Sequence, residues 1–96
     1  MKIKILTTDC FKNLNCLKIL NLRDNNIERL ERNMFNGLFK LETLYLAYNS
    51  IKYMDSNSFI LMKKLGELDL SNNRIVNLEN KVFCGLDKLE KLLLNE

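Results

Sequence analysis

Residues 38–61, which read LFKLETLYLAYNSIKYMDSNSFIL, carry the pattern that decides the fold. Leucine, isoleucine and phenylalanine stand at fixed places in this stretch, and the same places recur 24 residues earlier and 24 residues later. The shift aligns five columns: Leu20, Leu44, Leu68 and Leu92; Leu22, Leu46, Leu70 and Leu94; Ile3, Ile27, Ile51 and Ile75; Phe11, Phe35, Phe59 and Phe83; and Asn25, Asn49 and Asn73. A fixed period of this length predicts a solenoid, in which each repeat buries its apolar side chains against the next.

An amphipathic helix does not explain the leucines. The apolar residues between Leu38 and Ile51 are scattered around a helical wheel and form no single stripe. The alternation of Leu44 and Leu46 with Tyr45 fits a short strand, with the leucines on one face and the tyrosine on the other. We expect the equivalent strands of successive repeats to stack in parallel and in register.

The pattern L-x-x-L-x-L-x-x-N-x-I-x-x-L-x-x-x-x-F resembles the leucine-rich repeat family over the whole chain. It is most similar to the 24-residue subclass of Toll-type receptors, Slit-like proteins and other cell-surface recognition proteins. The resemblance implies an α/β fold class: a leucine-rich repeat solenoid with short parallel β-strands on the concave face and irregular or short-helical convex segments. The chain then looks like one uncapped segment of a longer array, 1–96, with full repeats at 14–37, 38–61 and 62–85 and partial repeats at 1–13 and 86–96.

Two columns are expected to have structural roles. In the family the asparagine is buried and bonds backbone groups of its own and the adjacent coil, which implies a ladder of Asn25, Asn49 and Asn73. The chemistry is suitable, because a turning backbone leaves N–H and C=O groups without partners and an amide both donates and accepts. The aromatic column is expected to stack as a spine on the convex side, formed by Phe11, Phe35, Phe59 and Phe83.

The convex return segments are too short for long helices, so we expect extended or single-turn helical pieces there. Gly37 and Gly85, with Asn13 at the matching place, predict a left-handed backbone residue before the leucine that opens each repeat. Leu61 occupies the same place in another repeat, which is therefore expected to turn differently.

Composition argues against several classes of function. The net charge of +3, from 15 basic and 12 acidic residues, is small and interspersed, so we predict no nucleic-acid partner. No apolar run approaches the roughly 18 residues of a membrane span, so this segment is not expected to insert into a membrane. There is no histidine, phosphate-binding loop, metal-ligand spacing or nucleophile with a base, which predicts no enzyme activity, no metal and no cofactor.

The three cysteines are interpreted as thiols. Cys10 and Cys84 lie about three coils apart, too far for a disulfide, and a Cys10–Cys16 bridge is unconvincing. Thiols fit either a reducing compartment or a piece of a longer array. The family resemblance implies an extracellular or cell-surface location as part of a longer chain, with a cytoplasmic location as the alternative.

The concave face is the candidate binding surface. Outward positions read from the strand phase include Ala47 and Ser71, and the residues chosen as protein-binding are Arg23, Tyr45, Tyr48 and Asp69. Tyrosine and arginine supply much of the binding energy at interfaces. A second surface column, Lys40, Lys64 and Lys88, is interpreted as solvated and partly compensated by Glu42 and Glu90, with an anion-binding edge as the alternative.

Three functions remain open from the sequence. The first is a non-enzymatic recognition module that resembles part of a cell-surface leucine-rich repeat receptor or adhesion protein and binds a protein ligand or co-receptor. The second is a spacer or incomplete repeat fragment without a ligand of its own. The third is an intracellular leucine-rich repeat scaffold.

Overall fold

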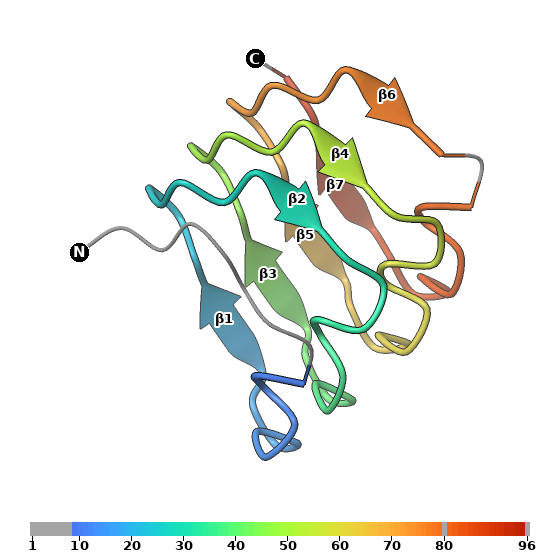
Figure 1. Ribbon diagram of the computed structural model, residues 1–96. Helices are drawn as coiled ribbons and strands as arrows, with labels where there is room; N and C mark the ends of the chain where they lie inside the picture. Colours follow the sequence, from blue (N-terminus) through green and yellow to red (C-terminus); the bar gives the residue numbers. More distant parts are fainter. Residues whose placement is uncertain (1–8, 80, 96) are drawn as a thin grey trace.

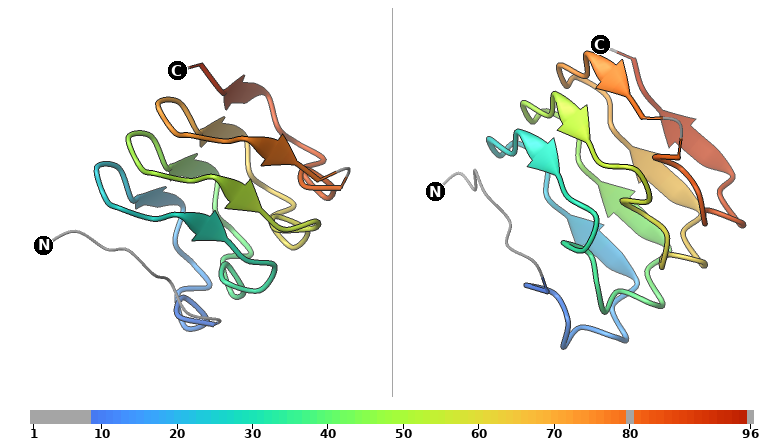
Figure 2. Two further views of the ribbon diagram at one scale, coloured as in Figure 1. Left: turned by 45° about the horizontal axis from the view of Figure 1, so that its top comes forward. Right: turned by 45° about the vertical axis from the view of Figure 1, so that its right-hand side comes forward.

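The computed structural model describes residues 9–79 and 81–95, which form a solenoid of stacked coils with one parallel sheet on each side (Figures 1 and 2). The first sheet has four strands in the order β1-β3-β5-β7: β1 (Ile19–Asn21), β3 (Thr43–Tyr45), β5 (Glu67–Asp69) and β7 (Lys91–Leu93). The second has three two-residue strands, β2 (Arg29–Leu30), β4 (Tyr53–Met54) and β6 (Asn77–Leu78). The predicted leucine-rich repeat solenoid with short parallel strands is confirmed.

The strand register follows the sequence period. Leu20 pairs with Leu44, Leu44 with Leu68, and Leu68 with Leu92, so each strand is displaced from its neighbour by one 24-residue repeat. Because side chains alternate along a strand, the leucines of all four strands point inward together. Leu44 and Leu68 are fully buried at the centre of the resulting core.

The convex side is extended, and no helix occurs in residues 9–79 or 81–95. Leu30 and Met54 are buried, whereas Arg29 and Tyr53 beside them are exposed. This is the alternation expected of a strand with one buried face and one solvent-exposed face. Each return is too short to gain from helix formation, because the first helical turn fixes several residues for one hydrogen bond. None of the described residues belongs to a helix long and apolar enough to span a membrane.

The turns before the strands adopt two geometries. Gly37 and Gly85 have φ values of 101° and 92°, as their place in the repeat predicts, and a Cβ on either would lie 2.5 Å from the backbone of the preceding coil. The prediction for Asn13 is wrong, because its φ is not positive, and Leu61 likewise avoids this conformation. In their turns the left-handed residue comes four positions earlier, at Asp9 and Asn57.

That earlier position suits the hydrogen bonding between coils. The N–H of Asp9 donates to the carbonyl of Asn33 at 3.3 Å, and the N–H of Asn57 donates to the carbonyl of Lys81 at 2.8 Å. Aspartate and asparagine tolerate the left-handed region better than most side chains, so the change of geometry is compatible with both sequences.

Asparagines fill the turns after the concave strands. Asn49 accepts from the N–H of Ile27 at 3.1 Å and donates to the carbonyl of Leu22 at 3.0 Å, both in the preceding coil. It also donates to two carbonyls of its own coil, at 3.0 and 3.3 Å. Asn73 makes the same four contacts one coil later, and Asn25 donates to two carbonyls of its own coil at 2.9 and 3.1 Å.

Four phenylalanine rings form a stack under the convex sheet. Ring centroids are 6.1, 5.8 and 6.1 Å apart along the series Phe11, Phe35, Phe59 and Phe83, and the interplanar angles are 14° or less. Phe35 and Phe59 are buried, while the two end rings are partly exposed. Offset stacking of this kind adds to the area that each ring buries.

Candidate functional site

The concave face consists of the side chains that the four-stranded sheet directs away from the core. In contrast to the leucines behind them, these side chains differ in every coil. Three residues predicted to face outward are buried: Asp69 is 5% exposed and Ser71 is 8% exposed. The most buried of them is Ala47, which is only 1% exposed. Its single methyl group follows the end of β3, between the Arg23 and Ser71 positions of the flanking coils, and is too short to emerge between them.

Arg23, Tyr45 and Asp69 come together across three coils. The Arg23 guanidinium carbon lies 4.1 Å from the centroid of the Tyr45 ring, and its Nη2 continues to Oδ2 of Asp69 at 3.5 Å. The arginine from the first coil thus crosses the tyrosine of the second to reach the carboxylate of the third. Such stacking uses the planar guanidinium and holds the side chain in one conformation.

Asp69 was predicted to face solvent, but it is only 5% exposed. Its Oδ1 accepts hydrogen bonds from the N–H of Ser71 at 3.0 Å and from the Ser71 hydroxyl at 2.6 Å. Burial alone would raise the pKa of Asp69, but the two bonds from Ser71 and the charge of Arg23 outweigh it, so the pKa lies below its ordinary value. Asp69 therefore positions Arg23 and offers little surface to a partner.

Tyr48 combines high exposure with an unfavourable backbone. Its φ is 58°, equal within a degree to that of Asp24 and Asn72 at the same place in the neighbouring coils. Aspartate and asparagine often adopt this conformation, whereas a bulky residue there is an outlier that costs about 1–2 kcal/mol. The ring gains little burial in return, since Tyr48 is 57% exposed. It lines a shallow depression of about 470 Å³ together with Asp24, Asn72 and Arg74.

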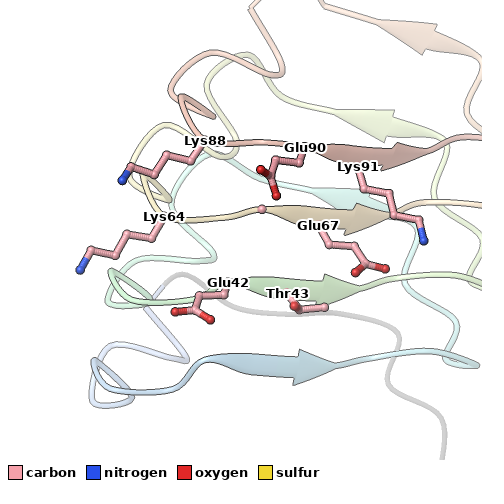
Figure 3. A pocket seen from close by; sticks show the side chains of 8 residues that line it. Glu42, Thr43, Lys64, Glu67, Lys88, Glu90 and Lys91 are labelled. Carbon is pink, nitrogen blue, oxygen red and sulfur yellow. The ribbon is translucent and has the colours of Figure 1, made fainter.

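A larger depression, of about 610 Å³, lies where the chain enters the concave strands (Figure 3). The repeat pattern did not predict this depression, although one signal for it is present in the sequence: Gly66 interrupts a column otherwise occupied by Lys18, Glu42 and Glu90. Six charged side chains line the depression: Glu42, Lys64, Glu67, Lys88, Glu90 and Lys91.

The lysine column does not behave as expected beside this depression. Lys64 and Lys88 point outward, away from the strands and from Glu42 and Glu90 (Figure 3). Ion pairs within 4 Å in the described part of the chain join only Arg23 to Asp69, Arg29 to Asp55 and Lys63 to Asp87. Direct compensation of the column by the two glutamates is therefore absent among these residues.

Residues 9–79 and 81–95 contain no group of three or more histidine, cysteine, aspartate or glutamate side chains placed to hold a metal ion. Cys10, Cys16 and Cys84 all lie at the surface and form no disulfide with one another. The groups that the concave face offers to a partner are therefore tyrosine rings, an arginine guanidinium and carboxylates.

Comparisons with known proteins agree with this architecture. The crystal structure of a TLR13–ssRNA13 complex contains a chain that superimposes with a TM-score of 0.94 at 35% sequence identity. The alignment covers 98% of the present chain but only 14% of the TLR13 chain, so the chain spans a small part of that receptor's length. No curated protein sequence matches the chain.

The TLR13 structure corrects one prediction. Nucleic acid was excluded because the net charge is small and interspersed, yet a protein of the same fold and 35% identity is solved in complex with single-stranded RNA. The net charge of a chain with this fold is thus a poor criterion for excluding nucleic-acid binding, because a ligand interacts with the charges of a local surface.

The family description "Leucine rich repeat" matches residues 2–51 and again residues 39–96, which together take in nearly the whole sequence. The matched spans contain the strands, the asparagine turns and the stacked phenylalanines described above. The chain belongs to the leucine-rich repeat family.

Proposed function

We propose that the chain is a non-enzymatic recognition module that binds a protein ligand or co-receptor through its concave face, as part of a receptor at the cell surface or in an endosome. Repeat proteins hold such a face rigid while its side chains vary, which suits binding. The likeness to TLR13 supports the receptor setting.

The observation that carries the proposal is Tyr48. A tyrosine in the left-handed region is less stable than the asparagine found one coil later, and its exposed ring does not recover that cost through packing. Strained residues of this kind tend to cluster at functional sites. Tyrosine is also among the side chains that most often dominate interface energetics. A spacer repeat without a ligand would gain from asparagine here.

Single-stranded RNA is the second candidate ligand, favoured by the TLR13–ssRNA13 complex. The concave face of this chain carries solvent-accessible carboxylates next to its cationic groups, among them Asp24 and Glu67. These would repel a phosphate backbone, whereas a protein surface can present either charge. We therefore place the protein ligand first.

The test substitutes Tyr48→Asn and compares it with Tyr53→Asn. Tyr53 is similarly exposed, at 51%, but lies on the convex strand β4 and is not in the left-handed region. Each immobilised protein is exposed to a fraction of secreted and cell-surface proteins. Captured species are identified by mass spectrometry and their affinities are then measured. In parallel, a labelled 13-nucleotide single-stranded RNA is titrated by fluorescence anisotropy.

We expect Tyr48→Asn to lower the affinity for the captured protein by at least about tenfold, as for an interface tyrosine. The same change should raise the thermal midpoint slightly by relieving about 1 kcal/mol of strain. Tyr53→Asn should leave the affinity unchanged. Equal capture by wild type and Tyr48→Asn contradicts the proposal, and saturable RNA binding without protein capture replaces it with the second candidate.

A further inference from the structure

Gly66 has no structural requirement for glycine. Its φ is not in the left-handed region, unlike those of Gly37 and Gly85, so an ordinary residue could adopt its backbone conformation. A Cβ added at Gly66 would lie 3.7 Å from the carbonyl oxygen of Glu42 and 4.0 Å from that of Lys88, which is normal van der Waals contact. Glycine beside a strand costs roughly 0.5–1 kcal/mol relative to alanine, so its presence calls for another explanation.

The backbone at Gly66 is fully used in stacking the coils. Its N–H donates to the carbonyl of Glu42 at 2.8 Å, and its carbonyl accepts from the N–H groups of Glu90 and Lys91 at 2.9 and 3.0 Å. A ligand therefore gains no hydrogen bond from this backbone. What glycine provides is the space left by its missing side chain, and that space is the floor of the 610 Å³ depression.

The walls of the depression have a defined charge order. Glu42 and Glu90 stand in the coils on either side of Gly66, and Glu67 lies beside them on β5 (Figure 3). Lys64 and Lys88 extend away at the outer rim (Figure 3). Lys91 is the register partner of Glu67 on β7, and its side chain extends toward the opposite end (Figure 3). The centre is thus acidic and the two ends are basic.

These charges remain without ion-pair partners, in contrast to those at the other end of the same sheet. Asp69, on β5 next to Glu67, is paired by Arg23 across the Tyr45 ring. None of the six charged groups around Gly66 makes an ion pair within the described residues. The pair at Asp69 shows what geometry satisfies a carboxylate on this sheet: a guanidinium that arrives across the face.

We propose that the Gly66 depression is the docking site for an arginine side chain of a protein partner, with acidic residues next to that arginine facing the lysines at the two ends. The planar guanidinium has several donors and can contact more than one carboxylate, and it binds carboxylates in a more defined geometry than lysine does. This inference rests on the proposed function and names the chemistry of the partner's contact.

The test is an NMR titration of the 15N-labelled 96-residue chain with the peptide acetyl-Glu-Ala-Arg-Ala-Glu-amide. The chain has only three glycines, so the amide signal of Gly66 has two internal controls, Gly37 and Gly85. Matched peptides carry citrulline, which is neutral and nearly isosteric, in place of arginine, or the inverted charges Lys-Ala-Glu-Ala-Lys. We expect a saturable shift of the Gly66 signal with the arginine peptide only, while the signals of Gly37 and Gly85 stay in place.

Two variants separate the site from general electrostatics. Glu67→Gln should lower the affinity for the arginine peptide by about tenfold, as expected for the loss of one charge-assisted hydrogen bond. Gly66→Leu should abolish the shifts, read at the Glu67 amide, because its side chain occupies the depression. Gly66→Ala should keep or raise the thermal midpoint, because the added Cβ meets no close neighbour. Should the leucine variant not fold, Gly66→Ala and Glu67→Gln provide the same readout.

Equal shifts with the citrulline peptide, stronger binding of the inverted peptide, or shifts unaffected by Glu67→Gln would each overturn the assignment. The captured ligand of the Tyr48 experiment separates this failure from that of the proposed function. If Gly66→Leu binds that ligand like wild type while Tyr48→Asn does not, the concave face is a binding face and the depression is not part of it.

Discussion

The interior columns and the concave columns of this solenoid belong to the same coils but follow opposite rules. Inside, leucine, asparagine and phenylalanine recur unchanged from coil to coil, and each makes the same contacts with its neighbour. On the concave face, no two coils carry the same residue at the position of Tyr45, which is Asn21 in one neighbour and Asp69 in the other.

The contrast separates what specifies the fold from what is available for binding. A repeated interior residue must fit copies of itself, so its column tolerates little change. An outward residue touches only the neighbouring coil and solvent, so it is free to differ. Substitutions inside should therefore lower stability, and those outside should alter binding. Tyr48 is an exception, because its ring faces outward while its strained backbone lowers the stability of the fold. A substitution there should change both binding and stability.

The largest effect is expected inside, at the phenylalanine stack. Phe59→Ala removes a fully buried ring that is stacked on both sides, and should lower the free energy of unfolding by about 3–5 kcal/mol. Phe83→Ala is the matched control, because Phe83 is partly exposed and has one stacking partner among the described residues. Urea denaturation followed by circular dichroism measures both. Equal losses would show that the stack does not act as a buried column.

A smaller loss is expected at the asparagine turns. Asn49→Leu leaves the N–H of Ile27 without its partner, whereas the carbonyl of Leu22 keeps the hydrogen bond from the Asn25 amide. A buried group left unsatisfied costs about 1–3 kcal/mol, so we expect a loss in that range. Asn25→Leu, at a more exposed turn, should cost less. Amide hydrogen exchange at Ile27 provides the local measurement, and unchanged protection there would contradict the role assigned to Asn49.

The smallest effect is expected on the concave face, at Asp69. Its pKa is lowered in the folded state, so its contribution to stability is complete above its ordinary pKa of 3.8 and is lost as the pH falls through the folded value. Asp69→Asn should cost about 0.5–1 kcal/mol at neutral pH, since Arg23 is partly exposed. The difference in thermal midpoint between wild type and variant should shrink progressively as the pH falls below 3.8. A gap that stays constant with pH would mean that the Arg23–Asp69 pair does not contribute.

The sequence predicted the interior well because repetition reports self-contact directly. Leu44, Asn49 and Phe59 recur at a fixed interval because each meets the same surroundings in the neighbouring coil, so the strand register could be predicted from the period alone. The two-residue convex strands were harder to predict, since the apolar spacing there fits either an extended or a single-turn helical segment.

The outward residues could not be predicted equally well. Alternation places Asp69 on the face, but the arrival of Arg23 from two coils away, which buries it, has no signature in the local sequence. The Gly66 depression depends on a residue that is missing its side chain, and a lone glycine more often marks a turn. The binding roles of Arg23, Tyr45, Tyr48 and Asp69 remain predictions.

The alternating turns described above imply that the structural unit of this solenoid is larger than its sequence repeat. Gly37 and Gly85 lie 48 positions apart, as do Asp9 and Asn57, and the two kinds of turn abut each other. The chain is therefore a stack of coil pairs, in which each pair contains one turn of each kind. Removal of a single coil would bring two turns of the same kind into contact, whereas removal of a pair preserves the alternation.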